Sequence, residues 1–132
     1  MPSDNSDYTY AEDEELVGQF LTWTGDAVAE LRTIADSLED NQPSNSEAAD
    51  RIYDLSHNIK GMGSSFNFDL MTSVGTSLCR YIKHGGATIS PKVIDAHVRI
   101  FEVVLANRIM GDGGEKGQAL QTRLSEIIAS ES

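Results

Sequence analysis

The sequence predicts an all-helical (all-α) fold, and three observations lead to that prediction. Apolar residues recur at steps of three and four along most of the chain, which is the period of an amphipathic helix. No segment shows the apolar–polar alternation of a strand bounded by hairpin turns. Residues that start or end helices divide the chain into five periodic segments joined by short loops. Because short loops join antiparallel neighbours, we expect an antiparallel four-helix bundle with an additional helix.

The first two predicted helices span residues 11–39 and 45–66. Each follows a capping-box pattern, in which a hydroxyl and a carboxylate cap backbone N–H groups at the helix start. The two predicted capping boxes are Thr9 with Glu12 and Ser44 with Glu47. The apolar stripe of the first helix consists of Leu16, Phe20, Trp23, Ala27, Leu31, Ile34 and Leu38.

The three remaining predicted helices span residues 69–84, 91–110 and 115–130. Glycines mark two of their ends, since glycine adopts the backbone conformation that terminates a helix. Polar residues and a proline mark two of their starts. In chain order these boundary residues are Gly85 with Gly86, Ser90 with Pro91, Gly111, and Asp112 with Glu115.

Negative charge is the strongest feature of the composition. The 132 residues include 10 basic and 21 acidic side chains, for a net charge of −11. Residues 1–15 hold six acidic side chains and no basic one. We expect residues 1–10 to form an acidic disordered tail, followed by a single domain over residues 11–132. Such a chain lacks the basic surface that tracks phosphates, which strongly disfavours nucleic acid, and we expect no nucleic-acid partner.

The sequence also predicts a cytoplasmic protein that does not bind or span a membrane. It contains no run of 18 apolar residues that could span a bilayer. Its acidic beginning lacks the basic and apolar regions of a secretory signal. A single cysteine, Cys79, excludes an internal disulfide and argues against a cysteine-based zinc site. We expect Cys79 to be a small buried residue.

Residues 51–68, RIYDLSHNIKGMGSSFNF, contain the most informative histidine of the chain. On a helical wheel at about 100° per residue, five apolar residues gather opposite His57. These residues are Ile52, Leu55, Ile59, Met62 and Phe66. His57 is therefore expected to face solvent rather than the core.

Small residues follow His57 along the same helix. Gly61 lies one turn later on the same face, and Ser64 lies beside that face one turn further on. Gly61 and Gly63 each cost roughly 1 kcal/mol relative to alanine inside a helix. Their presence indicates a need for space, and we interpret the patch as one that another protein's backbone can approach closely.

Lys60 and two other side chains flank His57. Lys60 comes three residues after His57, and Tyr53 and Asp54 lie on the preceding turn. Neutral imidazole is a nitrogen nucleophile, and a neighbouring cation disfavours imidazolium and favours an added anion. An exposed nucleophile, a cleared approach and an adjacent cation together fit a phosphoryl acceptor.

A metal site is the main rival interpretation of His57. The other histidines, His84 and His97, lie on different predicted helices, and no HxxxH or HExxH spacing occurs. Asp54 is placed to pair with His57, but the paired Glu-x-x-His motifs of di-iron bundles are absent. We therefore expect no metal. His84 is predicted to be a cation at a helix C-terminus, and His97 to be a residue of the core margin or the surface.

The run His57-Asn58-Ile59-Lys60-Gly61, followed by small residues and Phe66, resembles the HxxKG signature of histidine-containing phosphotransfer (HPt) domains. Those domains are helical bundles built on four helices, and they shuttle phosphoryl groups between receiver domains. The chain length and the helix order are similar to that family as well. The local motif covers about 12 residues, and the rest of the resemblance is architectural.

This resemblance implies roles for individual residues. His57 would be phosphorylated, Lys60 would hold or screen the phosphoryl group, and Gly61 would give steric access. The partners implied are a hybrid histidine kinase and the receiver domains of response regulators, with Mg²⁺ on the receiver and no cofactor on this chain. We expect the partner to contact Tyr53, Asp54, Met62 and Ser64. Phe68 and residues of the first helix are further candidates for the apolar docking area.

Two positions depart from the patterns of the family. Asn67 stands where the family usually has glycine, but asparagine tolerates left-handed backbone better than most residues. Cys79 stands where chemotaxis-type kinases usually have a glutamate that supports phosphorylation by the kinase's own catalytic domain. The departure at Cys79 favours transfer from a receiver aspartate.

Two other interpretations stay open at this point. In the first, the chain is a non-catalytic helical adaptor in which His57 has no chemical role. In the second, it is the HPt domain of a larger chemotaxis-type histidine kinase. The polar ending of the chain, IIASES, resembles a frayed natural terminus and favours a free-standing protein over the second of these.

Overall fold

The computed structural model describes residues 13–131, which form five α-helices, one short 3-10 helix and two very short strands. The α-helices are α1 (Glu14–Ser37), α2 (Glu47–Gly63), α3 (Asp69–His84), α4 (Pro91–Asn107) and α5 (Gly114–Ser130). The 3-10 helix η3 (Ser64–Phe66) follows α2, and the strands are β1 (Gln42–Pro43) and β2 (Thr88–Ile89). The all-α class is confirmed. The tail predicted over residues 1–10 lies outside the described residues.

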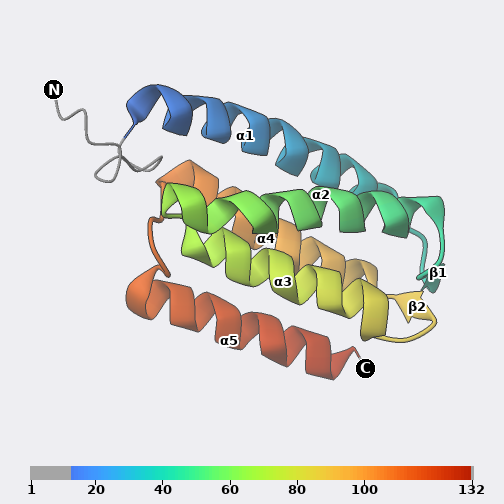
Figure 1. Ribbon diagram of the computed structural model, residues 1–132. Helices are drawn as coiled ribbons and strands as arrows, with labels where there is room; N and C mark the ends of the chain where they lie inside the picture. Colours follow the sequence, from blue (N-terminus) through green and yellow to red (C-terminus); the bar gives the residue numbers. More distant parts are fainter. Residues whose placement is uncertain (1–12, 132) are drawn as a thin grey trace, which may run out of the picture.

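Each α-helix runs roughly opposite to the one before it (Figure 1). The most extensive packing joins α2 to α3 and α1 to α4, while α5 packs on α4. β1 pairs antiparallel with β2, which ties the α1–α2 connection to the α3–α4 connection at one end of the molecule (Figure 1). These strands are not predicted from the sequence, because two residues are too few to show an apolar–polar alternation. No helix within residues 13–131 is long and apolar enough to cross a lipid bilayer.

The apolar core lies between α1, α2, α3 and α4. Leu31, Ile52, Ile59 and Phe101 are each fully buried there. At the end where α2 turns into α3, the ring of Phe20 stacks on the ring of Phe66, with centroids 4.6 Å apart. Burial of each such side chain stabilises the fold by about 1.5–3 kcal/mol. α5 contributes less, since its only buried residues are Gly117 and Leu124.

A charged cluster fastens α1 to α4 at the rim of the core. The Arg32 guanidinium donates to both oxygens of Glu102, at 3.1 and 2.9 Å, and to Asp95 at 2.7 Å. It also donates to Asp36 of its own helix. Bidentate pairs of this kind fix geometry more firmly than single contacts. The register of α1 against α4 is therefore set by polar as well as apolar contacts.

Two helix starts differ from the capping boxes predicted for them. The Asp13 carboxylate caps α1 by accepting from the Leu16 N–H at 3.1 Å, and the predicted box of Thr9 and Glu12 lies outside the described residues. The Ser46 hydroxyl caps α2 by accepting from the Ala49 N–H, so the prediction of Ser44 was wrong. Ser44 donates its hydroxyl to the Ala87 carbonyl, across the paired connections.

The boundary between α4 and α5 also differs from the prediction. α4 ends at Asn107, three residues early, because Arg108 takes a left-handed conformation (φ 46°). Gly111 instead lies in the connection, where its N–H donates to the Asn67 carbonyl. Left-handed Gly113 precedes α5, and the Asp112 carboxylate accepts from the Gly114 N–H at 2.9 Å, so Asp112 lies at the start of α5 as predicted.

The buried stripe of α1 is displaced from the predicted one. Trp23 is 38% exposed, whereas Thr24 and Ala35 are buried. α1 packs against both α2 and α4, and the small buried side chains of α1 allow the two neighbouring helices to come close to it. The helical period was therefore correct, but the largest apolar residue does not face the core.

His97 is fully buried between α3 and α4, so the prediction of a margin or surface residue was wrong. Its Nδ1 lies 2.8 Å from the Val93 carbonyl oxygen, and its Nε2 lies 2.9 Å from the Ser77 hydroxyl. A carbonyl only accepts, so Nδ1 donates and Nε2 of the neutral ring accepts from Ser77. Burial lowers the pKa of His97 to about 4, and the bond to Val93 acts in the opposite direction.

Candidate functional site

His57 lies near the middle of α2, and its side chain is exposed. The opposite face of α2 is buried through Ile52, Leu55 and Ile59. The expectation that the imidazole faces solvent is therefore confirmed. A rigid helix presents the ring at a fixed place on the surface, which a mobile loop would not do.

Gly61 leaves open space one turn after His57. A Cβ atom at Gly61 would meet nothing within 4 Å, and the residue is exposed. Gly63 serves a different purpose, because it is buried and a Cβ there would lie 2.6 Å from the Thr72 hydroxyl oxygen. The interpretation of a cleared patch therefore applies to Gly61, while Gly63 allows the end of α2 to pack against α3.

Tyr53 lies beside His57 on the side that faces α3. The two rings are 5.9 Å apart between centroids and inclined by 27°, which is a loosely stacked arrangement. The ammonium group of Lys83, at the end of α3, lies 4.5 Å from the centroid of the Tyr53 ring. This is a cation–π contact. The surroundings of His57 thus include a side chain of α3 that the sequence analysis did not find.

The backbones of α2 and α3 approach closely next to the histidine. A Cβ at Gly75 would lie 3.0 Å from the Lys60 Cβ and 3.1 Å from the Ser56 carbonyl oxygen. Further along, the Thr72 hydroxyl accepts from the Ser64 N–H at 2.9 Å and donates to the Lys60 carbonyl at 3.0 Å. These contacts fix the backbone that carries Lys60, whose side chain is partly exposed.

Cys79 is buried between α2 and α3, as predicted. Its thiol lies 3.9 Å from the Tyr53 carbonyl oxygen. Burial raises the pKa of the Cys79 thiol, although the charges of Lys60 and Lys83 act in the opposite direction. The thiol therefore stays protonated and does not compete with His57 as a nucleophile. Both ammonium groups lie close enough to this thiol to affect it.

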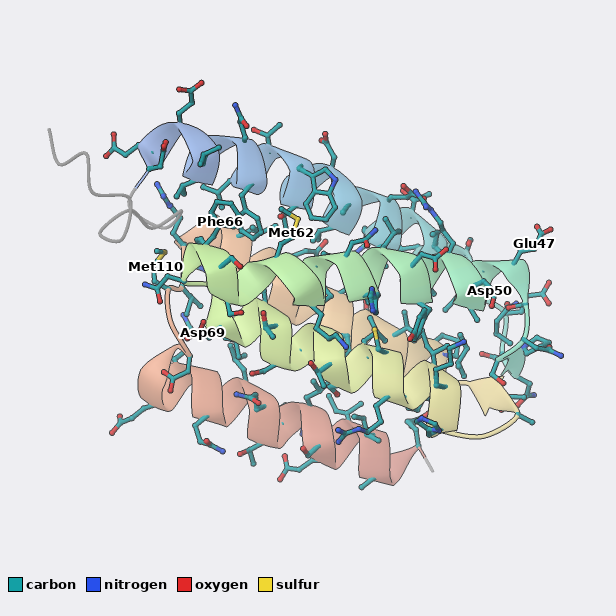
Figure 2. The ribbon with its side chains drawn as sticks, viewed as in Figure 1. Glu47, Asp50, Met62, Phe66, Asp69 and Met110 are labelled. Carbon is teal, nitrogen blue, oxygen red and sulfur yellow. The ribbon has the colours of Figure 1, made fainter. Side chains whose placement is uncertain are left out.

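The other predicted contact residues are spread along α2. Asp54 is exposed one turn before His57. Ser64 is exposed two turns after it, a rise of about 10 Å, so its hydroxyl belongs to the rim of the patch. Met62 is 39% exposed on the side of α2 that faces α1 (Figure 2), so it is available for the predicted partner contact, although the helical wheel groups it with the buried residues. Phe68 is fully buried and is not available for docking.

An open hollow of about 360 Å³ lies next to Met62. Leu16, Met62, Ser65 and Phe66 line it, so α1, α2 and η3 all contribute. Figure 2 shows Met62 and Phe66 at this junction, while Glu47 and Asp50 lie at the far end of α2. The hollow supplies an apolar surface on the α1 side, opposite the side of Lys60 and Lys83.

Asn67 makes the turn that ends this part of the chain. It has φ 64° and ψ 32°, which is left-handed backbone, directly after η3. The expectation that asparagine can replace glycine at this turn is confirmed.

Gly75, Thr72 and Lys83 are not predicted from the sequence, because all three act across the α2–α3 contact. One signal was present: Gly75 and Cys79 are small residues four apart on one face of a predicted helix, a spacing typical of close helix packing. Lys83 is one further turn along that face. Which helix lies opposite cannot be read from such a spacing.

We expect Gly75→Ala to lower the free energy of unfolding by about 1 kcal/mol, because the new methyl must push apart two helical backbones. Gly25→Ala is the matched control. A Cβ at Gly25 meets nothing within 4 Å, so this variant should gain up to about 1 kcal/mol from helix propensity. Urea unfolding measures both values. A Gly75 variant as stable as the Gly25 variant would contradict the close approach.

Within residues 13–131, no three His, Cys, Asp or Glu side chains gather closely enough to hold a metal ion. His84 is the last residue of α3, as predicted, and His97 is enclosed in the core. Neither lies on the helix that carries His57. No family model, curated protein or solved structure matches this chain. The residues and their geometry therefore carry the functional conclusion.

Proposed function

We propose that this chain is a histidine phosphotransfer protein of a two-component phosphorelay. His57 accepts a phosphoryl group from the aspartate of a receiver domain and passes it to another response regulator. The observation that carries the proposal is the exposed imidazole of His57 with open space at Gly61 on one side. Lys60, three residues after His57 and packed beside Gly75 of α3, and Lys83, over the Tyr53 ring, are the cations that would screen the charge of a phosphoryl group.

The arrangement of the helices supports the same proposal. Helices α1 to α4 run in alternating directions (Figure 1) around one core, and His57 is exposed on α2. An antiparallel four-helix bundle with one added helix and an acceptor on its surface is the arrangement of the HPt family. An acceptor in a cleft would be closed to a second folded domain, whereas one on a helix face is open to it.

The transfer step needs only groups that the two proteins supply. The lone pair of one imidazole nitrogen forms the N–P bond while the O–P bond to the receiver aspartate breaks. The electron pair of the broken bond leaves with the aspartate as carboxylate, and the other ring nitrogen keeps its proton. The reverse step passes the group to the next receiver. Catalysis in such transfers rests on positioning and charge stabilisation.

The chain acts in this scheme as an intermediate without turnover of its own. Mg²⁺ belongs to the receiver, and this chain contributes the nucleophile, the cations and the docking surface. The hollow at Met62 lies on the α1 side of α2, and Asp54 is exposed on the outer face of the same helix. Both are available for contact with the receiver. A cytoplasmic site of action follows from the proposal, since hybrid kinases present their receivers there.

Gly61→Leu is expected to slow transfer from a phosphorylated receiver about tenfold or more, because a bulky side chain occupies the space through which the receiver approaches. The fold should be kept, since a Cβ at this position meets no neighbour. Single-turnover transfer and thermal unfolding measure the two effects. With phosphoramidate as a small donor, the variant should react within about twofold of wild type. Normal transfer from the receiver would contradict the role of Gly61.

The proposal is tested by incubating the chain with a panel of phosphorylated receiver domains and following the label. At least one receiver should transfer its phosphoryl group within seconds to minutes. A helical adaptor would remain unlabelled with every receiver and would overturn the proposal. Labelling by a kinase catalytic domain with ATP, in the absence of any receiver, would instead identify the chemotaxis-type alternative.

A further inference from the structure

We infer that Tyr53 is a positioning residue for the imidazole of His57, and that Lys83 holds the Tyr53 ring in place. This inference rests on the function proposed above. From the sequence, Tyr53 is expected only to contact the partner, and Lys83 has no predicted role. The geometry points to a function that precedes docking, namely to prepare the nucleophile.

The first observation is the pairing of the two rings. Tyr53 and His57 are four residues apart on α2, so their side chains share one face. Their rings lie roughly parallel, inclined by 27°, with centroids 5.9 Å apart. An exposed histidine on a helix is otherwise free to rotate about both side-chain torsions. A neighbouring ring restricts that rotation and lowers the entropy lost when the imidazole reaches the attack geometry.

The second observation is that Tyr53 itself is held from two helices. It is partly buried and packs against the core cluster, while its backbone carbonyl lies against the Cys79 thiol of α3. The Lys83 ammonium, also from α3, lies 4.5 Å from the centre of its ring. A cation is attracted to the face of an aromatic ring, even at an exposed site. This attraction favours one ring position.

The third observation is the asymmetry of the surroundings. The Tyr53 ring comes from the turn of α2 before His57, whereas Gly61, where a Cβ would meet nothing within 4 Å, lies on the turn after it. A ring held from one side leaves the other for the phosphoryl donor. The effect of Tyr53 should therefore appear with any donor, including one too small to touch a docking surface.

The test uses phosphoramidate, which donates its phosphoryl group to histidine with release of ammonia and has no protein surface. We expect Tyr53→Leu to react about tenfold more slowly than wild type, since leucine fills the space without a ring. Tyr53→Phe keeps the ring and should react within about twofold of wild type. Lys83→Met should react about threefold more slowly, whereas Lys116→Met, an exposed lysine of α5, should react normally.

Two further measurements separate positioning from structure and from docking. Nuclear Overhauser effects between the ring protons of Tyr53 and His57 should be present in wild type and weakened in Lys83→Met, with the melting temperature little changed. With a receiver as donor, Tyr53→Leu should lower the maximal transfer rate and leave the half-saturating receiver concentration unchanged. A changed half-saturating concentration with a normal maximal rate would identify a docking contact and overturn the inference.

Failure of the inference is distinguishable from failure of the proposed function. If wild type is phosphorylated and Tyr53→Leu reacts equally fast with phosphoramidate, the positioning role is overturned and the function stands. If no donor phosphorylates wild type, both are overturned. Rescue of the rate by phenylalanine but not by leucine is the result that supports the positioning role.

Discussion

His57→Gln is expected to fold like wild type and to accept no phosphoryl group from any receiver. The side chain is exposed on the outer face of α2, so no core contact is lost. Glutamine is a good helix former of similar length, and its amide nitrogen is not a nucleophile. Circular dichroism and thermal unfolding should match wild type. Labelling in the transfer assay should fall to background, the largest effect expected of any substitution in this chain.

His84→Gln is the matched control for this variant. His84 is also exposed, but it is the last residue of α3 and lies on a different helix from Lys60 and Gly61. The His84 variant should be labelled at the wild-type rate. If His57→Gln were labelled as well as His84→Gln, His57 would not be the acceptor.

Acid should destabilise the protein through His97. Burial lowers the pKa of His97 to about 4 in the folded state, against about 6.5 for an ordinary histidine. As the pH falls, the His97 imidazole therefore takes up a proton in the unfolded chain before it does so in the folded protein. The contribution of neutral His97 to the free energy of unfolding is fully present above pH 6.5. It is lost progressively between pH 6.5 and about 4, by a total of about 3 kcal/mol. Urea unfolding at a series of pH values measures the loss.

His97→Gln isolates this contribution from that of the carboxylates. Glutamine can hydrogen-bond in the same place but takes up no proton in this range. Its stability should be lower than that of wild type at pH 7 and should fall less steeply between pH 6.5 and 4.5. Equal slopes for the two proteins over that interval would show that His97 is not held neutral by the fold.

Features set by local periodicity could be predicted from the sequence. The bounds of α3 agree with those observed, and the outward direction of His57 follows from the apolar residues opposite it. Asn67 could be foreseen as a left-handed turn, because few residues other than glycine adopt that backbone. Each of these is decided within one or two helical turns.

Features set by a neighbouring helix could not be predicted in the same way. The helical period does not say that α3 lies against α2, so the close contact at Gly75 and the position of Lys83 over Tyr53 were missed. His97 was misplaced because histidine is usually exposed, and its burial depends on Ser77 of α3 as a partner. Trp23 was misplaced because apolar character alone does not select the innermost residue.

The attachment site of the phosphate is the most direct test of the central claim. The chain is phosphorylated by a receiver and studied by ³¹P NMR and by mass spectrometry of its peptides. We expect one phosphoramidate signal, stable in alkali and lost in acid, on the peptide that contains His57. A phosphate ester on a serine or threonine, or a phosphoramidate on His84, would contradict the account.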